Sequence, residues 1–409
     1  MFKNKALSSI FLIVFIDLLG FSLILPLLPY LAKSFSASEF QIGLLVASYA
    51  LAQFIGAPFL GRLSDRYGRR PILLISIVGN ALGFLLLGIA QNLTMLFISR
   101  ILAGFTAANI SVAQAYISDV TDNQSRARGL GLIGAAFGLG FILGPAIGGA
   151  LSQFGYEYPA FSATGLSIIN FLLVFLWLKE SLTPERRQSI SLQQRPPLTL
   201  KAMLDTLRRP YVGPLLHTRF FFGLAFSLFQ TIFAIYALER FNLQARDTGY
   251  ILAYVGLISV LTQGVFIGKI TKRFSEINLM FAAILTMAVS LMVWALAPSI
   301  PVLLIALLPI AVSGGILNTV INSALSKSVA SVETGGILGL AASLESLTRV
   351  LAPSLGSLLL QIASKTYGNF IGTAVPGFLA SILLLWLGSY FWRMVFHMRP
   401  LVQSSSSMD

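Results

Sequence analysis

Two acidic residues interrupt long apolar stretches of this 409-residue chain, and both are candidates for binding a proton. Asp17 lies in SIFLIVFIDLLGFSLILPLL, and Glu345 lies in ILGLAASLESLTRVLAPSL. A charged carboxylate is costly in apolar surroundings, and desolvation favours its protonated form. The sequence therefore predicts proton coupling or substrate contact at Asp17. The alternative is an aspartate that only a neighbouring hydroxyl or arginine satisfies.

Arginines also lie inside apolar stretches, at Arg100, Arg219 and Arg349. Glu345 and Arg349 are four residues apart, so they share one face of a helix. One interpretation is an ion pair that neutralises itself. The other is that protonation of Glu345 frees Arg349 and changes the charge of a cavity. Arg219 is close to the predicted cytoplasmic end of its stretch, where a long side chain can reach the membrane surface.

The composition of the chain is that of a membrane protein. The chain is 56% hydrophobic and only 11% charged, whereas soluble proteins have about 25% charged residues. A net charge of +13 would indicate nucleic acid in a soluble protein, but here we expect no nucleic-acid partner. The chain has no cysteine and two histidines, so we expect no metal site and no cofactor.

A membrane-spanning helix needs about 20 mostly apolar residues, and twelve stretches meet that requirement. The predicted spans are 8–32, 40–61, 71–90, 94–118, 127–152, 159–178, 213–238, 247–268, 277–297, 300–325, 335–362 and 370–394. Pro26 and Pro29 are expected to break up the first helix. With the N-terminus inside, 21 of the 28 lysines and arginines fall on cytoplasmic segments, which predicts two cytoplasmic termini.

The sequence repeats itself at an interval of 207 or 208 residues. GRLSDRY, from Gly61, recurs as GKITKRF, from Gly268, and Pro145 aligns with Pro353 in a second pair of segments. Parallel repeats are typical of transporters that bind substrate between two halves. We therefore expect two pseudo-symmetric six-helix bundles, 1–178 and 213–396, joined by a cytoplasmic linker, 179–212. The remainder, 397–409, is expected to be a cytoplasmic tail, disordered from Gln403.

The loop GRLSDRYGRRPIL resembles the loop 2–3 signature of the major facilitator superfamily. GFILGPAIGG resembles the antiporter motif of the fifth helix, and FISRILAGFTAA resembles the fourth-helix motif that contains Arg100. The resemblance is greatest to the twelve-helix drug/proton antiporters, including tetracycline exporters. It implies the major facilitator fold, an all-α membrane protein, and a role for Arg100 in proton coupling with Asp17. Glu345 and Arg349 are further proton-coupling candidates because of their position inside an apolar stretch.

The resemblance also assigns two structural motifs. The loop would be a breakable cytoplasmic latch in which Asp65 meets the eleventh helix; its residues are Gly61, Asp65, Arg66, Gly68, Arg69 and Arg70. The antiporter motif would be a flexing seam of small residues that seals against leak, although static packing is the alternative. Its residues are Gly140, Gly144, Pro145, Gly148 and Gly149.

In this fold helices one, four, seven and ten line the cavity, which here implies apolar walls with few polar anchors, suited to an amphipathic organic molecule. The candidates are Asn109, Gln114, Phe226, Phe229, Gln230, Tyr236, Asn318 and Asn322. Tetracycline exporters also have an aspartate in helix three, where this chain has Gly83, and an acidic residue in helix nine, where it has none. These departures weaken a tetracycline assignment.

The sequence therefore predicts a monomeric, proton-coupled antiporter in a bacterial-type inner membrane. It would export small amphipathic organic compounds by alternating access, driven by the proton gradient. A proton-coupled importer of a small metabolite on the same fold is the alternative. A receptor or scaffold that does not transport is less consistent with complete gating and antiporter motifs. An enzyme is not expected, because the sequence has no phosphate loop and no G-x-S-x-G motif.

Overall fold

The apolar stretches form helices in the computed structural model, which describes residues 5–121, 123–183, 205–329 and 331–405. Within these residues, twelve segments are helical, long and apolar enough to cross a bilayer. Helices satisfy their backbone N–H and C=O groups internally, as the hydrocarbon core requires. The prediction of an all-α protein with twelve transmembrane helices is confirmed.

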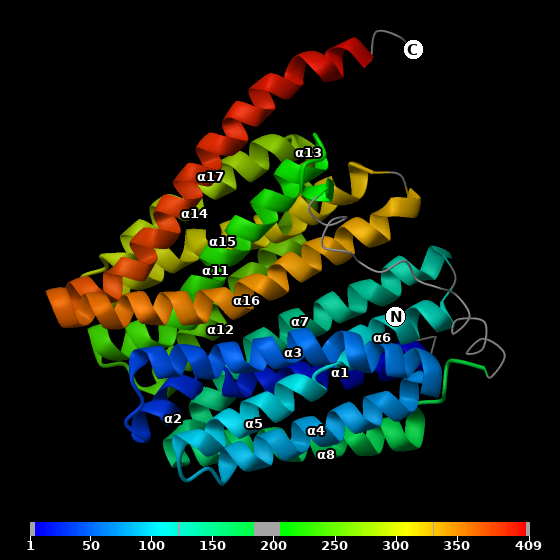
Figure 1. Cartoon of the computed structure of the whole chain (residues 1–409), viewed down its shortest axis with the longest axis vertical. Coiled ribbons are helices and arrows are strands. Elements are labelled where there is room, and N and C mark those ends of the chain that lie inside the picture. The colour runs from blue at the N-terminus through cyan, green and yellow to red at the C-terminus, as the bar shows by residue number, and fades with distance from the viewer. Residues whose placement is uncertain (1–4, 122, 184–204, 330, 406–409) are drawn as a thin grey trace. The chain divides into compact units, whose positions relative to one another are not determined.

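The N-terminal half contains the first six spans, and Figure 1 draws them in blue to green. Its elements are α1 (Lys5–Ile24), α2 (Leu28–Ser34), α3 (Glu39–Tyr67), α4 (Arg69–Gly88), α5 (Leu93–Thr106), α6 (Asn109–Val120), α7 (Asn123–Leu151), the short η1 (Ser152–Phe154) and α8 (Glu157–Trp177).

The C-terminal half contains the other six spans. Its elements are α11 (Val212–Phe241), α12 (Ala245–Leu261), the π-helical turn η2 (Thr262–Phe266), α13 (Ile267–Arg273), α14 (Glu276–Ala295), α15 (Ile300–Lys327), α16 (Ser331–Tyr367) and α17 (Asn369–Ser405).

Two of the N-terminal spans are divided. α1 ends at Ile24 and α2 begins at Leu28 with a proline in its first turn, which confirms the predicted break near Pro26 and Pro29. The fourth span also divides, because α5 ends at Thr106 and α6 begins at Asn109. No proline marks this second break, and the sequence did not predict it.

The chain divides into two compact units. Unit 1 contains residues 1–196 and 237–257, and unit 2 contains residues 197–236 and 258–409. The C-terminal end of α11 and most of α12 therefore belong to unit 1 by their contacts. The predicted bundles assigned these residues to the C-terminal bundle by position in the sequence.

Unit 1 is held together by close packing of its helices. α1 packs against α7 and α8, α4 against α5 and α8, and α3 against α5; Figure 1 shows α4 and α8 side by side. Gly56 and Gly104 allow α3 and α5 to approach backbone to backbone, because a Cβ at either would collide with a carbonyl oxygen of the other helix.

Unit 2 is organised around α14, which packs against α15 and α17. Trp294 of α14 is 1% exposed and contacts the rings of Phe229 and Tyr236, at centroid distances of 5.1 and 4.7 Å. The Tyr236 hydroxyl donates a hydrogen bond to the Trp294 carbonyl oxygen at 2.7 Å. An aromatic core therefore joins α11 to α14.

The C-terminal tail differs from its prediction. α17 continues to Ser405, so the expected disorder from Gln403 is wrong for the described residues, and 406–409 lie outside them. No glycine after Gly388 is present to terminate this helix. Most of the predicted linker, residues 184–204, also lies outside the described residues.

Candidate functional site

Asp17 is held on α1 by two neutral amides rather than by a cation. Asn80 of α4 and Asn109 of α6 both donate from Nδ2 to Asp17 Oδ1, at 3.1 and 2.6 Å. Asn109 lies at the first position of α6, so the break in the fourth span helps to position it. Both donors use Oδ1, and the described residues provide no hydrogen bond to Oδ2. The amides thus orient the carboxylate while one oxygen remains available for a proton.

Arg100 makes no ion pair with Asp17 within the described residues, and its role in proton coupling stays a prediction. The side chain is 1% exposed, and its guanidinium lies 5.9 Å from the ring centroid of Tyr49 and 5.7 Å from that of Phe84. Aromatic faces attract cations. Arg100 Nη2 is buried and has no hydrogen-bond partner among the described residues. The arginine is therefore stabilised mainly by aromatic rings.

Glu345 lies between two arginines in unit 2. Arg349 Nη2 donates to its Oε1 at 2.7 Å, as the four-residue spacing predicted. Arg219 Nη2 pairs with its Oε2, and Arg219 Nη1 donates to Asn318 Oδ1 at 2.7 Å. Arg219 is therefore an inward, paired residue, and the interpretation that it reaches the membrane surface is wrong. Partners on α15 and α16 could not be read from the sequence of α11.

The predicted latch loop has a well-defined geometry within unit 1. Gly68 separates α3 from α4 with φ 109° and ψ 158°, a conformation that favours glycine. Arg69 Nη1 pairs with Asp65 at 2.7 Å, and its Nε pairs with Asp119 at 3.1 Å. A Cβ at Gly61 would meet open space. The guanidinium carbon of Arg66 lies 5.5 Å from the ring centroid of Tyr67. The contact of Asp65 with the eleventh helix stays a prediction.

Glu180, which the sequence analysis missed, fixes this loop. Its carboxylate accepts hydrogen bonds from the backbone N–H groups of Arg69 and Arg70, at 2.9 and 3.2 Å, at the N-terminus of α4. A helix N-terminus favours such a negative charge. The Arg70 side chain donates to the Phe175 carbonyl oxygen at 2.6 Å. An acidic residue directly after a span is the signal that would have indicated this cap.

The antiporter motif packs on both sides through its small residues. Gly140, Gly144 and Gly148 of α7 face α1, and Ser22 donates to the Gly140 carbonyl oxygen at 2.7 Å. Gly149 faces the start of α12, where a Cβ would lie 2.9 Å from the Arg246 carbonyl oxygen. Gly249 of α12 in turn contacts the Pro145 carbonyl oxygen. The motif is therefore a backbone-to-backbone seam within unit 1.

The predicted cavity residues divide into two groups. Asn109, Phe229 and Tyr236 are 3%, 1% and 0% exposed and lie in the interiors described above, which corrects their assignment to a cavity wall. Their polar or aromatic character serves Asp17 and the Trp294 core instead. The other candidates are partly or fully exposed: Gln114, Phe226, Gln230, Asn318 and Asn322.

These features are those of one known family. The sequence profile of the Major Facilitator Superfamily matches residues 10–353 and 220–394. The chain belongs to the Major Facilitator Superfamily. It is accordingly an integral membrane protein and a transporter by family and by fold.

Two curated relatives of this superfamily member are a tetracycline resistance protein and a multidrug resistance protein. The chain is 33% identical over 380 residues to the class C tetracycline resistance protein of Escherichia coli, over 90% of this chain and 92% of that protein. It is 28% identical over 350 residues to multidrug resistance protein 2 of Bacillus subtilis (strain 168), over 85% and 87% of the two chains.

A solved structure supports the fold. A bacterial homologue of the human lysosomal transporter Spinster, inward-facing and occupied, matches with a TM-score of 0.81 at 14% identity, over 96% of this chain and 97% of that one. The major facilitator fold of the chain is therefore confirmed by sequence and by structure.

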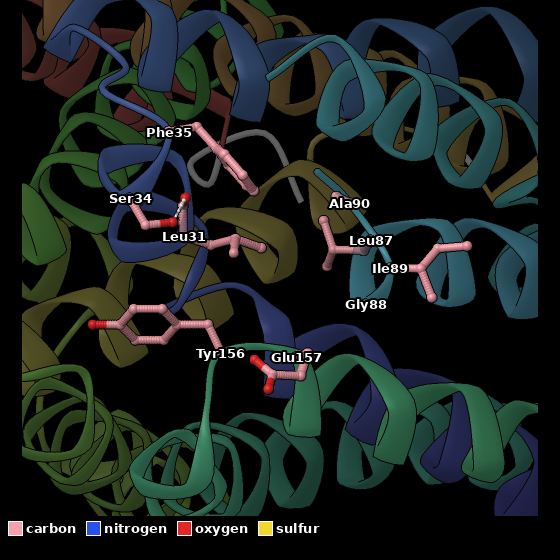
Figure 2. A pocket seen from close by; sticks show the side chains of 9 residues that line it. All are labelled: Leu31, Ser34, Phe35, Leu87, Gly88, Ile89, Ala90, Tyr156 and Glu157. Atoms are coloured by element: carbon pink, nitrogen blue, oxygen red, sulfur yellow. Dashed lines mark hydrogen bonds between the residues drawn. The ribbon is translucent and has the colours of Figure 1, made fainter. Parts of the chain in front are cut away.

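Two surface pockets of this transporter lie apart from the predicted site residues. Figure 2 shows one of about 320 Å³, where Leu31, Phe35 and Glu157 line the space between α2, the end of α4 and the start of α8. Glu157 begins α8, so its charge already has a structural explanation in the helix dipole. The other, of about 370 Å³, contains the Glu276–Lys327 ion pair of 2.7 Å.

Proposed function

We propose that this chain is a proton-coupled antiporter that exports small amphipathic organic compounds by alternating access. It would work in a bacterial-type inner membrane, as a monomer, with both termini in the cytoplasm. Its relatives include a tetracycline resistance protein and a multidrug resistance protein, which supports a drug-like substrate class. The inward proton gradient would supply the energy.

One observation carries the proposal: Asp17 is an acidic residue within a membrane span whose hydrogen-bond donors are both neutral. A carboxylate paired with a fixed cation would stay charged, because losing its charge would leave the cation alone. Neutral amides impose no such penalty. Asp17 can therefore alternate between a charged and a protonated form while Asn80 and Asn109 keep its position.

Glu345 has the opposite environment. Arg219 and Arg349 both favour its charged form, so this geometry supports a permanently paired carboxylate rather than one that takes up a proton and frees Arg349. We therefore assign the transported proton to Asp17 and a fixed charge to Glu345.

Alternating access needs surfaces that can separate and close again. The glycine seam between α7 and the start of α12 supports this role, because backbone contacts without interlocking side chains can reform in register. The Gly68 turn and its Arg69 network support the role of the loop as a latch at the cytoplasmic ends of α3 and α4.

The test uses purified full-length protein in proteoliposomes that contain a pH-sensitive dye, under an imposed proton gradient. A panel of amphipathic drugs, tetracycline among them, is added to the wild type, to Asp17→Asn and to Asp247→Asn. Asp247 is a matched control, because it is a partly exposed acid at the start of α12. We expect at least one drug to trigger proton flux in the wild type and in the control, and none in Asp17→Asn.

Two results would contradict the proposal. Drug-triggered proton flux that persists in Asp17→Asn would show that Asp17 does not carry the transported proton. Metabolite counterflow without any drug-coupled proton flux would instead identify an importer on the same fold.

A further inference from the structure

The ionic cluster of unit 2 has more positive than negative charge. Glu345 is its carboxylate, and it pairs with the guanidiniums of both Arg219 and Arg349. No second acidic side chain forms an ion pair with either arginine in the part of the chain that the structure describes. The cluster therefore carries a net charge of +1 within membrane-spanning helices, where unmatched charge is unfavourable.

The two arginines have different environments. Arg219 has a side-chain exposure of 7%, with Asn318 and Glu345 as its partners. Arg349 has a side-chain exposure of 54%, and Glu345 receives one hydrogen bond from its Nη2. A guanidinium has five N–H donors, so Arg349 keeps most of its donors for another partner. The buried arginine is structural, and the exposed one is available for a ligand.

An aromatic residue lies further along α11, on the face that carries Arg219. Arg219, Gly223 and Phe226 lie on one face of α11 at intervals of four and three residues. Gly223 faces Thr348, the neighbour of Arg349, because a Cβ there would lie 3.1 Å from the Thr348 hydroxyl oxygen. Phe226 is half-buried and stacks on Phe222 at a centroid distance of 5.8 Å. The α11 face that carries Arg219 and meets Thr348 therefore also offers an aromatic ring.

We propose that Arg349 binds the anionic group of the transported compound and that Phe226 contacts its apolar part. The substrate class is then an amphipathic organic anion, which deepens the proposed function and rests on it. The planar fork of arginine matches the paired oxygens of a carboxylate or sulfonate. A cationic substrate would have to displace an arginine from Glu345, so the cluster disfavours it.

The test measures binding directly, without a proton gradient. Purified full-length protein in detergent micelles is titrated calorimetrically with 2-naphthalenesulfonate and with 2-naphthylmethylammonium, which share an aromatic body and differ in charge. The proteins are the wild type, Arg349→Gln, Arg349→Lys and Arg273→Gln. Arg273 is a matched control, an exposed arginine at the end of α13 in the same unit.

We expect the wild type to bind the sulfonate at least tenfold more tightly than the ammonium. Arg349→Gln should weaken sulfonate binding at least tenfold and leave ammonium binding within twofold. Arg349→Lys keeps the charge and the fold but loses the planar fork. Its affinity for the sulfonate should lie between those of the wild type and Arg349→Gln. Arg273→Gln should match the wild type.

Three results would overturn the proposal: no sulfonate binding to the wild type, preference of the wild type for the ammonium, or unchanged sulfonate affinity in both Arg349 variants. Asp17→Asn separates this proposal from the proposed antiport, because it should keep the sulfonate affinity and lose proton flux. Sulfonate binding that depends on Arg349, in a wild type without proton flux, would leave the anion site standing and overturn the antiport.

Discussion

Asn109 shows how a neutral side chain can control a proton site. It donates the shorter of the two hydrogen bonds to Asp17, at 2.6 Å, and its own Oδ1 is buried without a partner among the described residues. Its amide is therefore committed to the carboxylate. Hydrogen bonds to a charged group contribute about 1.5–3 kcal/mol, so Asn109 sets how readily Asp17 accepts a proton.

Replacement of Asn109 by alanine tests this control. Loss of one donor to the charged form favours protonation, so the pH of half-maximal drug-coupled transport should rise by about 1 unit. The measurement is the pH profile of proton flux in proteoliposomes. Ser111→Ala is the control, because Ser111 is exposed on the same helix and is not among the predicted cavity residues. A profile in Asn109→Ala that matches the control would mean that this hydrogen bond does not tune the site.

Glu345 should matter for stability through Arg219. Glu345→Gln leaves the buried Arg219 without its anion, and breaking a buried pair from one side costs about 3–5 kcal/mol. We expect a clear fall in the melting temperature of Glu345→Gln in detergent. The double variant Arg219→Leu/Glu345→Leu should recover much of it, since no buried charge is left unpaired and the remaining Arg349 side chain is 54% exposed. Equal loss in both variants would show that packing, rather than charge pairing, dominates.

At the scale of helices, the seam between α7 and α12 depends on two glycines. Gly249→Ala would place a Cβ against the Pro145 carbonyl oxygen and 3.1 Å from the Gly149 Cα, so the helices must move apart. Overpacking of this kind costs about 1–3 kcal/mol, and we expect transport to fall about tenfold. Gly268→Ala on α13 meets open space and should transport like the wild type. Full activity in Gly249→Ala would show that close contact at this seam is dispensable.

A second contact joins α2 to the end of α11 within unit 1. Lys33 Nζ lies 2.7 Å from Glu39 Oε1 and 2.8 Å from Glu239 Oε1. Burial lowers the pKa of Lys33, but the hydrogen bonds and charges of Glu239 and Glu39 outweigh it, so the pKa is raised above its ordinary value. A raised lysine pKa means that the stabilisation is complete below the ordinary value and is lost only as pH rises above it.

Lys33→Gln should therefore lower the melting temperature by about 1–2 °C, because partly exposed pairs contribute about 1 kcal/mol or less. The difference from the wild type should stay constant between about pH 6 and pH 9 and shrink above about pH 10.5. The double variant Lys33→Gln/Glu239→Gln should have a melting temperature closer to that of the wild type, because one of the two carboxylates left without a cation is removed. A difference that disappears near pH 7 would contradict the raised pKa.

At the scale of the whole chain, the spans could be predicted because hydropathy is a local property. Each predicted stretch overlaps one observed span, and Pro26 and Pro29 indicated the first break. The superfamily followed from motifs whose glycines and charges are also local. The Gly68 turn, with its positive φ, is the structural reason for one of those glycines.

The partners of the charged side chains could not be predicted in the same way. Asn80 and Asn109 meet Asp17 from residues 63 and 92 positions away, and Arg219 meets Glu345 across 126 positions. Such contacts depend on the rotation of each helix about its axis, which an apolar pattern on nearly every face leaves undefined. Burial of Phe229 and Tyr236 around Trp294 was missed for the same reason.

The absence of cysteine from the sequence makes the predicted orientation directly testable. Gln91, between α4 and α5, is predicted to face outward, and Lys272, at the end of α13, to face the cytoplasm; both are exposed. Since lysines and arginines concentrate on cytoplasmic segments, a membrane-impermeant maleimide should label Gln91→Cys in intact cells and label Lys272→Cys only after permeabilisation. The unlabelled wild type is the control. Labelling of Lys272→Cys alone in intact cells would reverse the topology, and with it the direction in which Asp17 meets the proton gradient.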